Sequence, residues 1–169
     1  GYDYQRARML MTQEVNAAIL GALDAGAEEI LVNDAHGSMT NILIEELNPK
    51  ASLISGTPNM LGMMEGIDDS FDAALFIGYH SRMNSSGVLS HTYHGAVVSD
   101  ITINGKPSGE FYINASVAGS FGVPVVLVSG DDVLEKEVHA INGDIESVVV
   151  KNALGRYAAK GMAPLHARN

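Results

Sequence analysis

The chain has 169 residues, of which 46% are hydrophobic and 18% are charged, and this predicts one compact soluble domain over residues 1–169. Its formal charge of −10, with only ten Lys and Arg residues, argues against nucleic-acid binding and favours cations as ligands, and no apolar run approaches the roughly 18 residues of a membrane span. The absence of cysteine excludes disulfides, thiolate metal ligands and a cysteine nucleophile, and with no secretion signal the cytoplasm is the expected location.

The first half of the chain alternates helical and strand patterns. Apolar side chains recur at helical spacing up to a closing Gly26, and short β-branched runs ended by turn formers follow. A proline stops the second helical pattern. The predicted elements are a helix over residues 4–25, a strand over 30–32, a helix over 41–49, and strands over 51–56 and 71–79.

The second half continues the same alternation. An Asn104–Gly105 pair predicts a tight turn after an alternating run, and Gly122 is expected near the end of a helix. The predicted elements are a strand over residues 97–105, a helix over 110–122, a strand within 123–132, a helix over 132–142, and a strand passing into the start of a helix over 145–161.

Strands that are apolar throughout, alternating with helices, are typical of the α/β class. We therefore predict a mostly parallel sheet with helices on both faces. Chains of this class usually begin with a strand, whereas this one begins with a helix and has no initiator Met. We expect that a strand precedes residue 1 in a longer gene product.

Acidic and histidine side chains follow three of the predicted strands. Because the carboxyl ends of parallel strands meet at one edge of a sheet, side chains that follow them gather there. With His91 and Glu110 from the intervening segment, the candidates are Asp34, His36, His80, His91, Glu110, Asp131 and Asp132. Histidine nitrogens and carboxylate oxygens suit zinc where no thiolate is present, although no short HExxH signature occurs.

Each of these residues also has a structural explanation. A histidine after a strand can simply bond a carbonyl in a turn, and Glu110 suits the first turn of a helix. Asp131 and Asp132 precede a helix, where aspartate is a natural N-cap. A Ser90–His91 nucleophilic pair is disfavoured, because adjacent residues of an extended chain diverge and no GxSxG elbow surrounds them. His94 has no assigned role.

Several stretches, in this order, resemble the zinc-dependent D-aminopeptidase family over nearly the whole chain. They are VNDAHGSMTN, ISG, DAALFIGYHSR, GVLSH, NGKPSGE, NASVAG, VPVVLVSGDD and VVVKNALGRYAA. The resemblance implies that His36, His80 and Glu110 bind the metal and that His91 is catalytic. It also implies that an opening strand with an Asp-x-Glu-Gly motif lies upstream and that the family continues beyond Asn169.

The resemblance implies hydrolysis of the N-terminal peptide bond of short peptides containing D-amino acids, by a zinc-activated water. It also implies a ring-like homo-oligomer. From location alone, we expect Asp131 or Asp132 to bind the substrate amine. The alternatives are a catalytically silent metal or small-molecule binding protein and a metallohydrolase acting on a non-peptide amide or ester.

Overall fold

The computed structural model describes residues 3–168, and the chain divides into two compact units. Residues 1–67 and 163–169 make up the first unit, and residues 68–162 make up the second. A single domain over residues 1–169 stays a prediction. Within residues 3–168, no helix combines the length and the apolar character that a membrane span requires.

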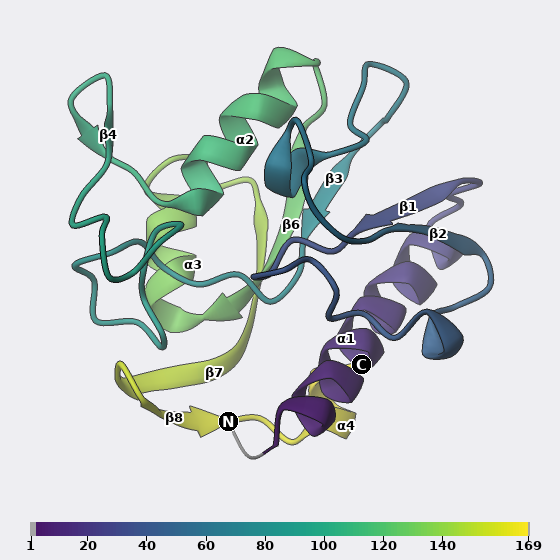
Figure 1. Ribbon diagram of the computed structural model, residues 1–169, viewed down its shortest axis with the longest axis horizontal. Helices are drawn as coiled ribbons and strands as arrows, with labels where there is room; N and C mark the ends of the chain where they lie inside the picture. Colours follow the sequence, from purple (N-terminus) through teal and green to yellow (C-terminus); the bar gives the residue numbers. More distant parts are fainter. Residues whose placement is uncertain (1–2, 169) are drawn as a thin grey trace. The chain divides into compact units, whose positions relative to one another are not determined.

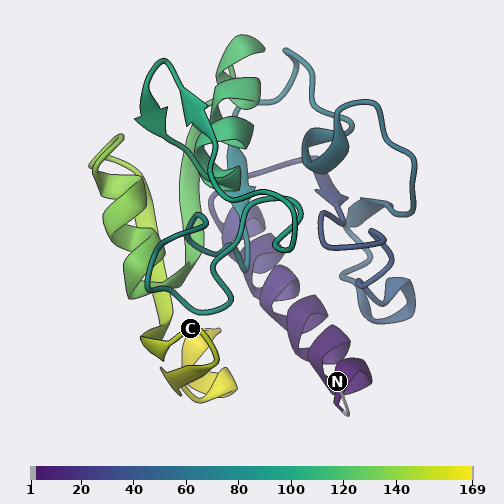
Figure 2. The same cartoon turned by 60° about the vertical axis from the view of Figure 1, so that its left-hand side comes forward.

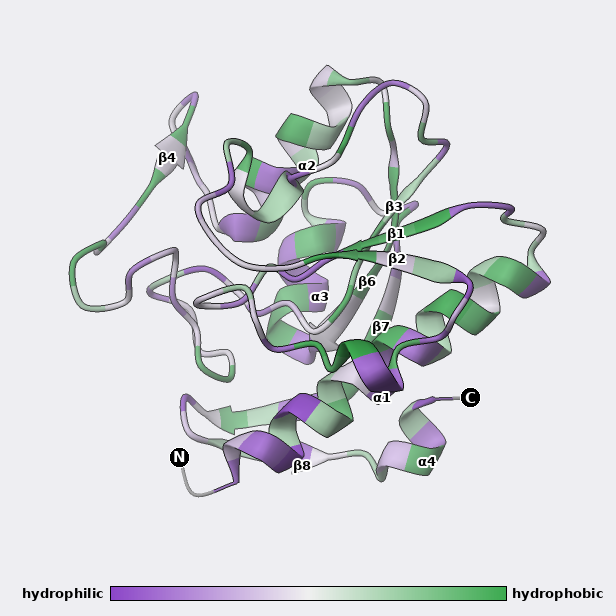
Figure 3. Cartoon of the chain, turned by 45° about the vertical axis from the view of Figure 1, so that its right-hand side comes forward, coloured by the Kyte–Doolittle hydropathy of each residue, from purple (hydrophilic) through white to green (hydrophobic). Residues whose placement is uncertain are grey.

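The first unit packs one long helix against a small parallel sheet (Figure 1). Buried Ile19 of the helix meets Ile42 and Leu47 in this core. Hydrophobic and hydrophilic residues alternate along α1 (Figure 3), as expected for a helix with one packed face. The elements are α1 (Tyr4–Asp24), β1 (Ile30–Asn33), the 3₁₀ turns η1 (Ile44–Glu46) and η2 (Gly62–Met64), β2 (Ala51–Ile54) and α4 (Pro164–Ala167).

The predicted helix over residues 41–49 is wrong, since only the single turn η1 forms there. Side chains elsewhere in the unit accept hydrogen bonds from this segment's backbone N–H groups and keep it extended. The Asp34 carboxylate accepts from the N–H of Ile42 at 2.7 Å, and Thr12 Oγ1 accepts from the N–H of Leu43 at 3.0 Å. These tertiary hydrogen bonds replace those that a helix would make.

The second unit is built on a four-stranded sheet in the order β3-β6-β7-β8, in which only β8 is antiparallel to its neighbour. This confirms the α/β class and the predominance of parallel pairing. The aromatic rings of Phe76, Tyr79 and Phe111 pack together in the core. The strands are β3 (Ala74–Phe76), β6 (Val125–Asp131), β7 (Glu146–Gly155) and β8 (Ala158–Gly161), and the helices are α2 (Glu110–Ser120) and α3 (Asp132–His139).

Two hairpins complete the second unit. The strands β4 (Thr102–Ile103) and β5 (Lys106–Pro107) are joined through Asn104 and Gly105, whose φ angles of 52° and 78° confirm the predicted tight turn. The predicted start of a helix within residues 145–161 is wrong, because β8 turns back and pairs with β7. Local propensity favours a helix here, but pairing with the adjacent strand β7 satisfies the hydrogen-bonding groups of the backbone instead.

Candidate metal centre

Two histidines and one glutamate of the second unit converge on one point. In each of His80, His91 and Glu110, one potential ligand atom lies within 4.8 Å of those of the other two. His80 follows β3, His91 lies in the long loop before β4, and Glu110 is the first residue of α2. Figure 2 shows this loop beside the first turn of α2. Among residues 3–168, this is the one such group.

Glu110 is the buried centre of the group, with 5% of its surface exposed. Its Oε2 lies 3.3 Å from His80 Nε2, while its Oε1 accepts a hydrogen bond from the N–H of Tyr93 at 2.6 Å and lies 3.8 Å from His91 Nε2. Burial by itself raises the pKa of Glu110, but the hydrogen bond and charge of His80 and the Tyr93 N–H outweigh it, so the pKa is lowered. The carboxylate is therefore ionised and ready to bind a cation.

Both imidazoles present Nε2 to Glu110, because Nδ1 is engaged elsewhere. His80 Nδ1 lies 3.1 Å from the carbonyl of Ser81, and His91 Nδ1 lies 2.7 Å from the carbonyl of Leu89. A carbonyl only accepts, so each Nδ1 carries the hydrogen and each neutral ring keeps its lone pair on Nε2. An N–H bonded to a carbonyl is the usual way in which proteins orient metal-binding histidines.

A proton and a metal ion compete for the Nε2 atom of His80. Burial alone lowers the pKa of His80, but the hydrogen bond and negative charge of Glu110 prevail and raise it. The rings of His80 and His91 stack at 3.9 Å between centroids and 21° between planes. The His80–His91–Glu110 group could hold a metal ion, and binding of a cation there is expected to weaken as the pH falls.

The backbone on both sides of His91 adopts the left-handed conformation. Leu89 and Tyr93 each have a φ of 53°, which is unfavourable for bulky side chains. The Leu89 carbonyl orients His91, and the Tyr93 N–H binds Glu110. Both residues are at least half exposed, so packing alone does not enforce this conformation. The hydrogen bonds that Leu89 and Tyr93 make with His91 and Glu110 hold the backbone in this unfavourable conformation, so backbone strain is part of how the site is built.

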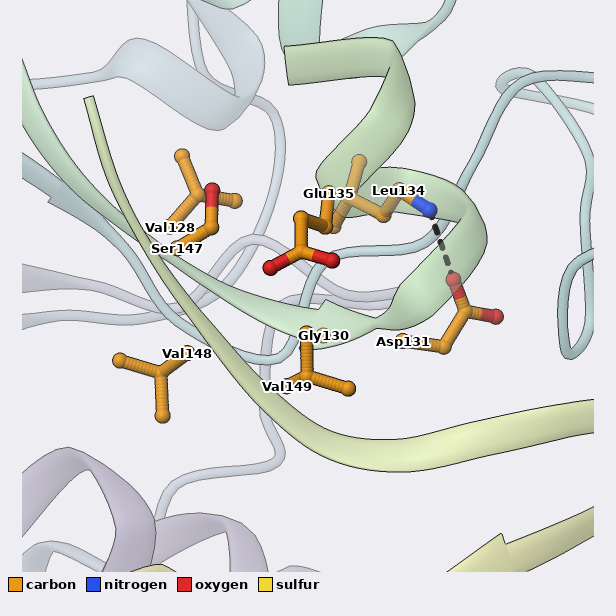
Figure 4. A pocket seen from close by; sticks show the side chains of 8 residues that line it. All are labelled: Val128, Gly130, Asp131, Leu134, Glu135, Ser147, Val148 and Val149. Atoms are coloured by element: carbon orange, nitrogen blue, oxygen red, sulfur yellow. Dashed lines mark hydrogen bonds between the residues drawn. The ribbon is translucent and has the colours of Figure 1, made fainter. Parts of the chain in front are cut away.

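Asp131 fastens the loop that carries His91. Its Oδ2 accepts from the N–H of Val88 at 2.6 Å, and its Oδ1 accepts from the first turn of α3, including the N–H of Leu134 at 2.8 Å (Figure 4). The N-cap interpretation is thus confirmed for Asp131. The hollow drawn in Figure 4 has no room for a water molecule. Substrate binding by Asp131 stays a prediction, as its carboxylate already accepts three backbone N–H groups.

Asp132 is more accessible than Asp131, with 26% of its side chain exposed. Its Oδ1 accepts from the N–H of Ala153 at 2.7 Å, and its Oδ2 lies 3.6 Å from Lys136 Nζ. The hydrogen bond from Ala153 and the nearby Lys136 lower its pKa. A role in binding the substrate amine stays a prediction for Asp132 as well.

His36, the remaining predicted ligand, belongs to the first unit. It follows β1 in an exposed turn, where its carbonyl accepts from the N–H of Met39 at 2.8 Å. Buried Asp34 organises this turn by accepting hydrogen bonds from Asn41 and Ile42. The structure therefore brings together His80, His91 and Glu110, while metal binding by His36 stays a prediction.

Glu137 on α3 is a part of the site that the sequence patterns did not single out. Its Oε2 accepts from the N–H of Arg82 at 2.9 Å, two residues after His80, while its buried Oε1 has no hydrogen-bond partner within the described residues. Burial raises its pKa. Its position three residues after Leu134 and next to Val138, both apolar and buried, was the signal that it faces inward.

Replacing Gly109 with alanine should destabilise the protein by about 1–3 kcal/mol through steric overlap. The new Cβ would lie 2.7 Å from Arg82 Cβ and 2.8 Å from Glu137 Oε1. Gly119 of α2 has nothing within 4 Å, so Gly119→Ala is the matched control and should stabilise by roughly 0.5–1 kcal/mol. Urea unfolding measures both changes, and equal effects of the two substitutions would contradict the packing described for Gly109.

The His80–Glu110 pair should make the stability of the metal-free protein depend on pH. Because the pKa of Glu110 is lowered from 4.5, its stabilisation is present above that value and is lost as the pH falls through the lowered pKa. Because the pKa of His80 is raised from 6.5, its stabilisation is present below that value and is lost as the pH rises through the raised pKa. Urea unfolding of the chelated protein should therefore show the pair stabilising more at about pH 5.5 than at about pH 8.

The variant His80→Gln isolates this effect. Its loss of stability relative to the parent protein should be larger at the lower pH than at the higher one, and His94→Gln, in an exposed position of the same loop, is the control. A constant difference between His80→Gln and the parent protein would rule out the proposed pairing.

Comparisons with known proteins give consistent results. A sequence model of a peptidase family described as D-aminopeptidase matches residues 1–169. A D-aminopeptidase of Bacillus subtilis (strain 168) is 42% identical over 165 residues, which are 98% of this chain and 60% of that protein. A solved structure, described as the Zn-dependent D-aminopeptidase DppA from Bacillus subtilis, a self-compartmentalizing protease, matches with a TM-score of 0.96, 42% identity and the same coverage. The chain thus spans 60% of the length of these relatives.

Proposed function

Because this chain belongs to the D-aminopeptidase family, we propose that the protein removes the N-terminal residue of short peptides containing D-amino acids, by metal-dependent hydrolysis. The observation that carries this proposal is the convergence of His80, His91 and Glu110 within 4.8 Å of one another. The D-configuration of the substrate rests on the family.

Zinc is the proposed metal, and the donors fit it. His80 offers an Nε2 lone pair whose direction is fixed by the Ser81 carbonyl, and Glu110 offers an ionised carboxylate. His36 is retained as the third proposed protein ligand. When bound, zinc lowers the pKa of a coordinated water and polarises the scissile carbonyl.

His91 is proposed to move the proton. Its Nδ1–H donates to the Leu89 carbonyl at 2.7 Å, which fixes the orientation of the ring. Nε2 is then the atom that accepts and donates a proton. Once Nε2 is protonated, it can donate to the leaving amine or to the oxyanion of the tetrahedral intermediate. Glu110 Oε1 lies 3.8 Å from this Nε2 atom.

Hydrolysis of D-alanyl dipeptides tests the proposal. The parent protein should cleave them, a chelator should abolish cleavage and zinc should restore it. His80→Ala should lose both zinc and activity, whereas His91→Ala should lose activity and keep zinc. Zinc content measured by atomic absorption separates these two outcomes. His94→Ala, an exposed change in the same loop, is the control and should keep both.

The same experiment distinguishes the alternatives. Zinc binding without turnover of any dipeptide would favour a silent binding protein. Equal turnover of a substrate with a blocked α-amine would favour a non-peptide amide hydrolase. Comparison with L-alanyl dipeptides tests the D-configuration.

We also propose that the protein assembles into a ring-like homo-oligomer. The support is the description of the 42% identical relative as a self-compartmentalizing protease. An enclosed assembly would restrict entry to short peptides. Light scattering coupled to gel filtration should give a mass several times that of one chain, and a monomeric mass would exclude the assembly.

A further inference from the structure

The tip of the β7–β8 hairpin touches the loop that carries His91. At this tip, the carbonyl of Arg156 accepts a hydrogen bond from the N–H of Leu89 at 2.8 Å. The Leu89 carbonyl in turn orients His91 at 2.7 Å. Arg156 lies in VVVKNALGRYAA, one of the stretches that carry the family resemblance, yet the proposed function gives this stretch no role. Its backbone nevertheless lies one hydrogen bond from the residue that orients His91.

The guanidinium of Arg156 and the side chain of His91 both lie near Gly95. A Cβ built on Gly95 would be 3.3 Å from His91 Cβ and 3.7 Å from Arg156 Nη2. Gly95 has no side chain, so it places no atoms at this point near the two groups. The guanidinium also lies over the Tyr157 ring, 5.7 Å from its centroid, and this contact limits its mobility.

Arg156 forms no ion pair within the described residues. That is notable in a chain with a formal charge of −10, where acidic residues outnumber basic ones by 20 to 10. An unpaired arginine beside a cation-binding site is poorly placed to help hold a metal, since the two positive charges repel. It is well placed to attract an anionic part of a ligand that reaches the site.

We propose that Arg156 determines specificity by binding the free C-terminal carboxylate of the short peptide whose N-terminal bond is cleaved. This inference rests on the proposed function. The planar guanidinium matches a carboxylate with two parallel hydrogen bonds. In a dipeptide, the terminal carboxylate lies about one residue, or roughly 3.6 Å, beyond the scissile bond, and in a tripeptide about two. His91 Cβ and Arg156 Nη2 both lie within 3.7 Å of one point beside Gly95, so a short peptide held at His91 can reach the guanidinium.

Substitution of the Arg156 side chain isolates this role. The hydrogen bond to Leu89 uses the backbone carbonyl of Arg156, so a side-chain change leaves the support of His91 in place. Arg156→Gln should therefore raise KM for D-alanyl-glycine by about 10- to 100-fold with little change in kcat. For D-alanyl-glycinamide, which has no carboxylate, the parent and Arg156→Gln proteins should have equal KM values.

Two further variants sharpen the test. Arg156→Lys keeps the charge but not the planar fork, and should recover part of the affinity. Lys160→Gln removes an exposed charge from the adjacent strand β8 and should leave both KM values unchanged. If Arg156→Gln raised KM for acid and amide equally, or for neither, the assignment of Arg156 would be overturned.

A binding measurement keeps this inference separate from the proposed function. The probes are D-alanyl-glycine with its peptide bond reduced to CH2–NH, and the corresponding carboxamide, titrated calorimetrically into the zinc-loaded protein. The acid should bind the parent protein about tenfold or more tightly than the carboxamide, and Arg156→Gln should erase this difference. Equal affinities in the parent protein would overturn the inference, whether or not the protein cleaves any peptide.

Discussion

Replacing Glu110 with glutamine should lower kcat/KM for D-alanyl dipeptides by on the order of 10³-fold, because it removes the negative charge at the centre of the site. Glu110 is the residue that meets both histidines, at 3.3 Å from His80 and 3.8 Å from His91. The amide of glutamine keeps an acceptor for the Tyr93 N–H, so the local fold should survive. The loss is therefore expected in zinc affinity and turnover.

Steady-state kinetics at saturating zinc, together with zinc titration against a competing chelator, measure the two effects of Glu110→Gln. The control is Glu135→Gln, which makes the same chemical change on α3, away from His80 and His91. The control should keep its zinc affinity and its activity within about twofold, as ordinary surface changes do. If Glu110→Gln bound zinc and turned over like the control, the metal centre would have to lie elsewhere.

Replacing Asp131 with alanine should destabilise the protein by about 3 kcal/mol, the largest effect on stability that we expect from a single side chain. The carboxylate is 2% exposed and accepts three backbone N–H groups from two separate segments. Alanine would remove the cap of α3 and leave the N–H of Val88, in the loop that carries His91, without its acceptor. Urea unfolding measures the loss.

Asp132→Ala is the matched control for Asp131→Ala. Its carboxylate is partly exposed and makes one backbone hydrogen bond and an exposed pair with Lys136, so the loss should be about 1 kcal/mol or less. The pair of variants also separates structure from substrate binding. If Asp131→Ala were as stable as the parent protein but bound amine-bearing substrates more weakly, the structural role described for Asp131 would be wrong and the predicted substrate role would gain support.

Local patterns determined much of the fold. The helical spacing that predicts a helix over residues 4–25 is borne out by α1, and the patterns over 110–122 and 132–142 by α2 and α3. Each of these helices buries one side against a nearby strand or loop. Apolar residues at helical spacing in the sequence indicate such a buried side. Residues 41–49 were misassigned because Thr12, distant in sequence, binds their backbone, and residues 158–161 because they pair with the preceding strand β7.

The sequence by itself also showed which residue types follow the strands and lie between them, and its seven candidates included His80, His91 and Glu110. Only the tertiary structure decided that the three meet, which of their nitrogen atoms face inward, and that Asp131, Glu137 and the Arg156 carbonyl brace their surroundings. The physical reason lies in the loop before β4. Its course depends on backbone hydrogen bonds and on residues with left-handed backbone conformation, such as Leu89 and Tyr93. Neither feature produces a periodic pattern of apolar and polar residues in the sequence.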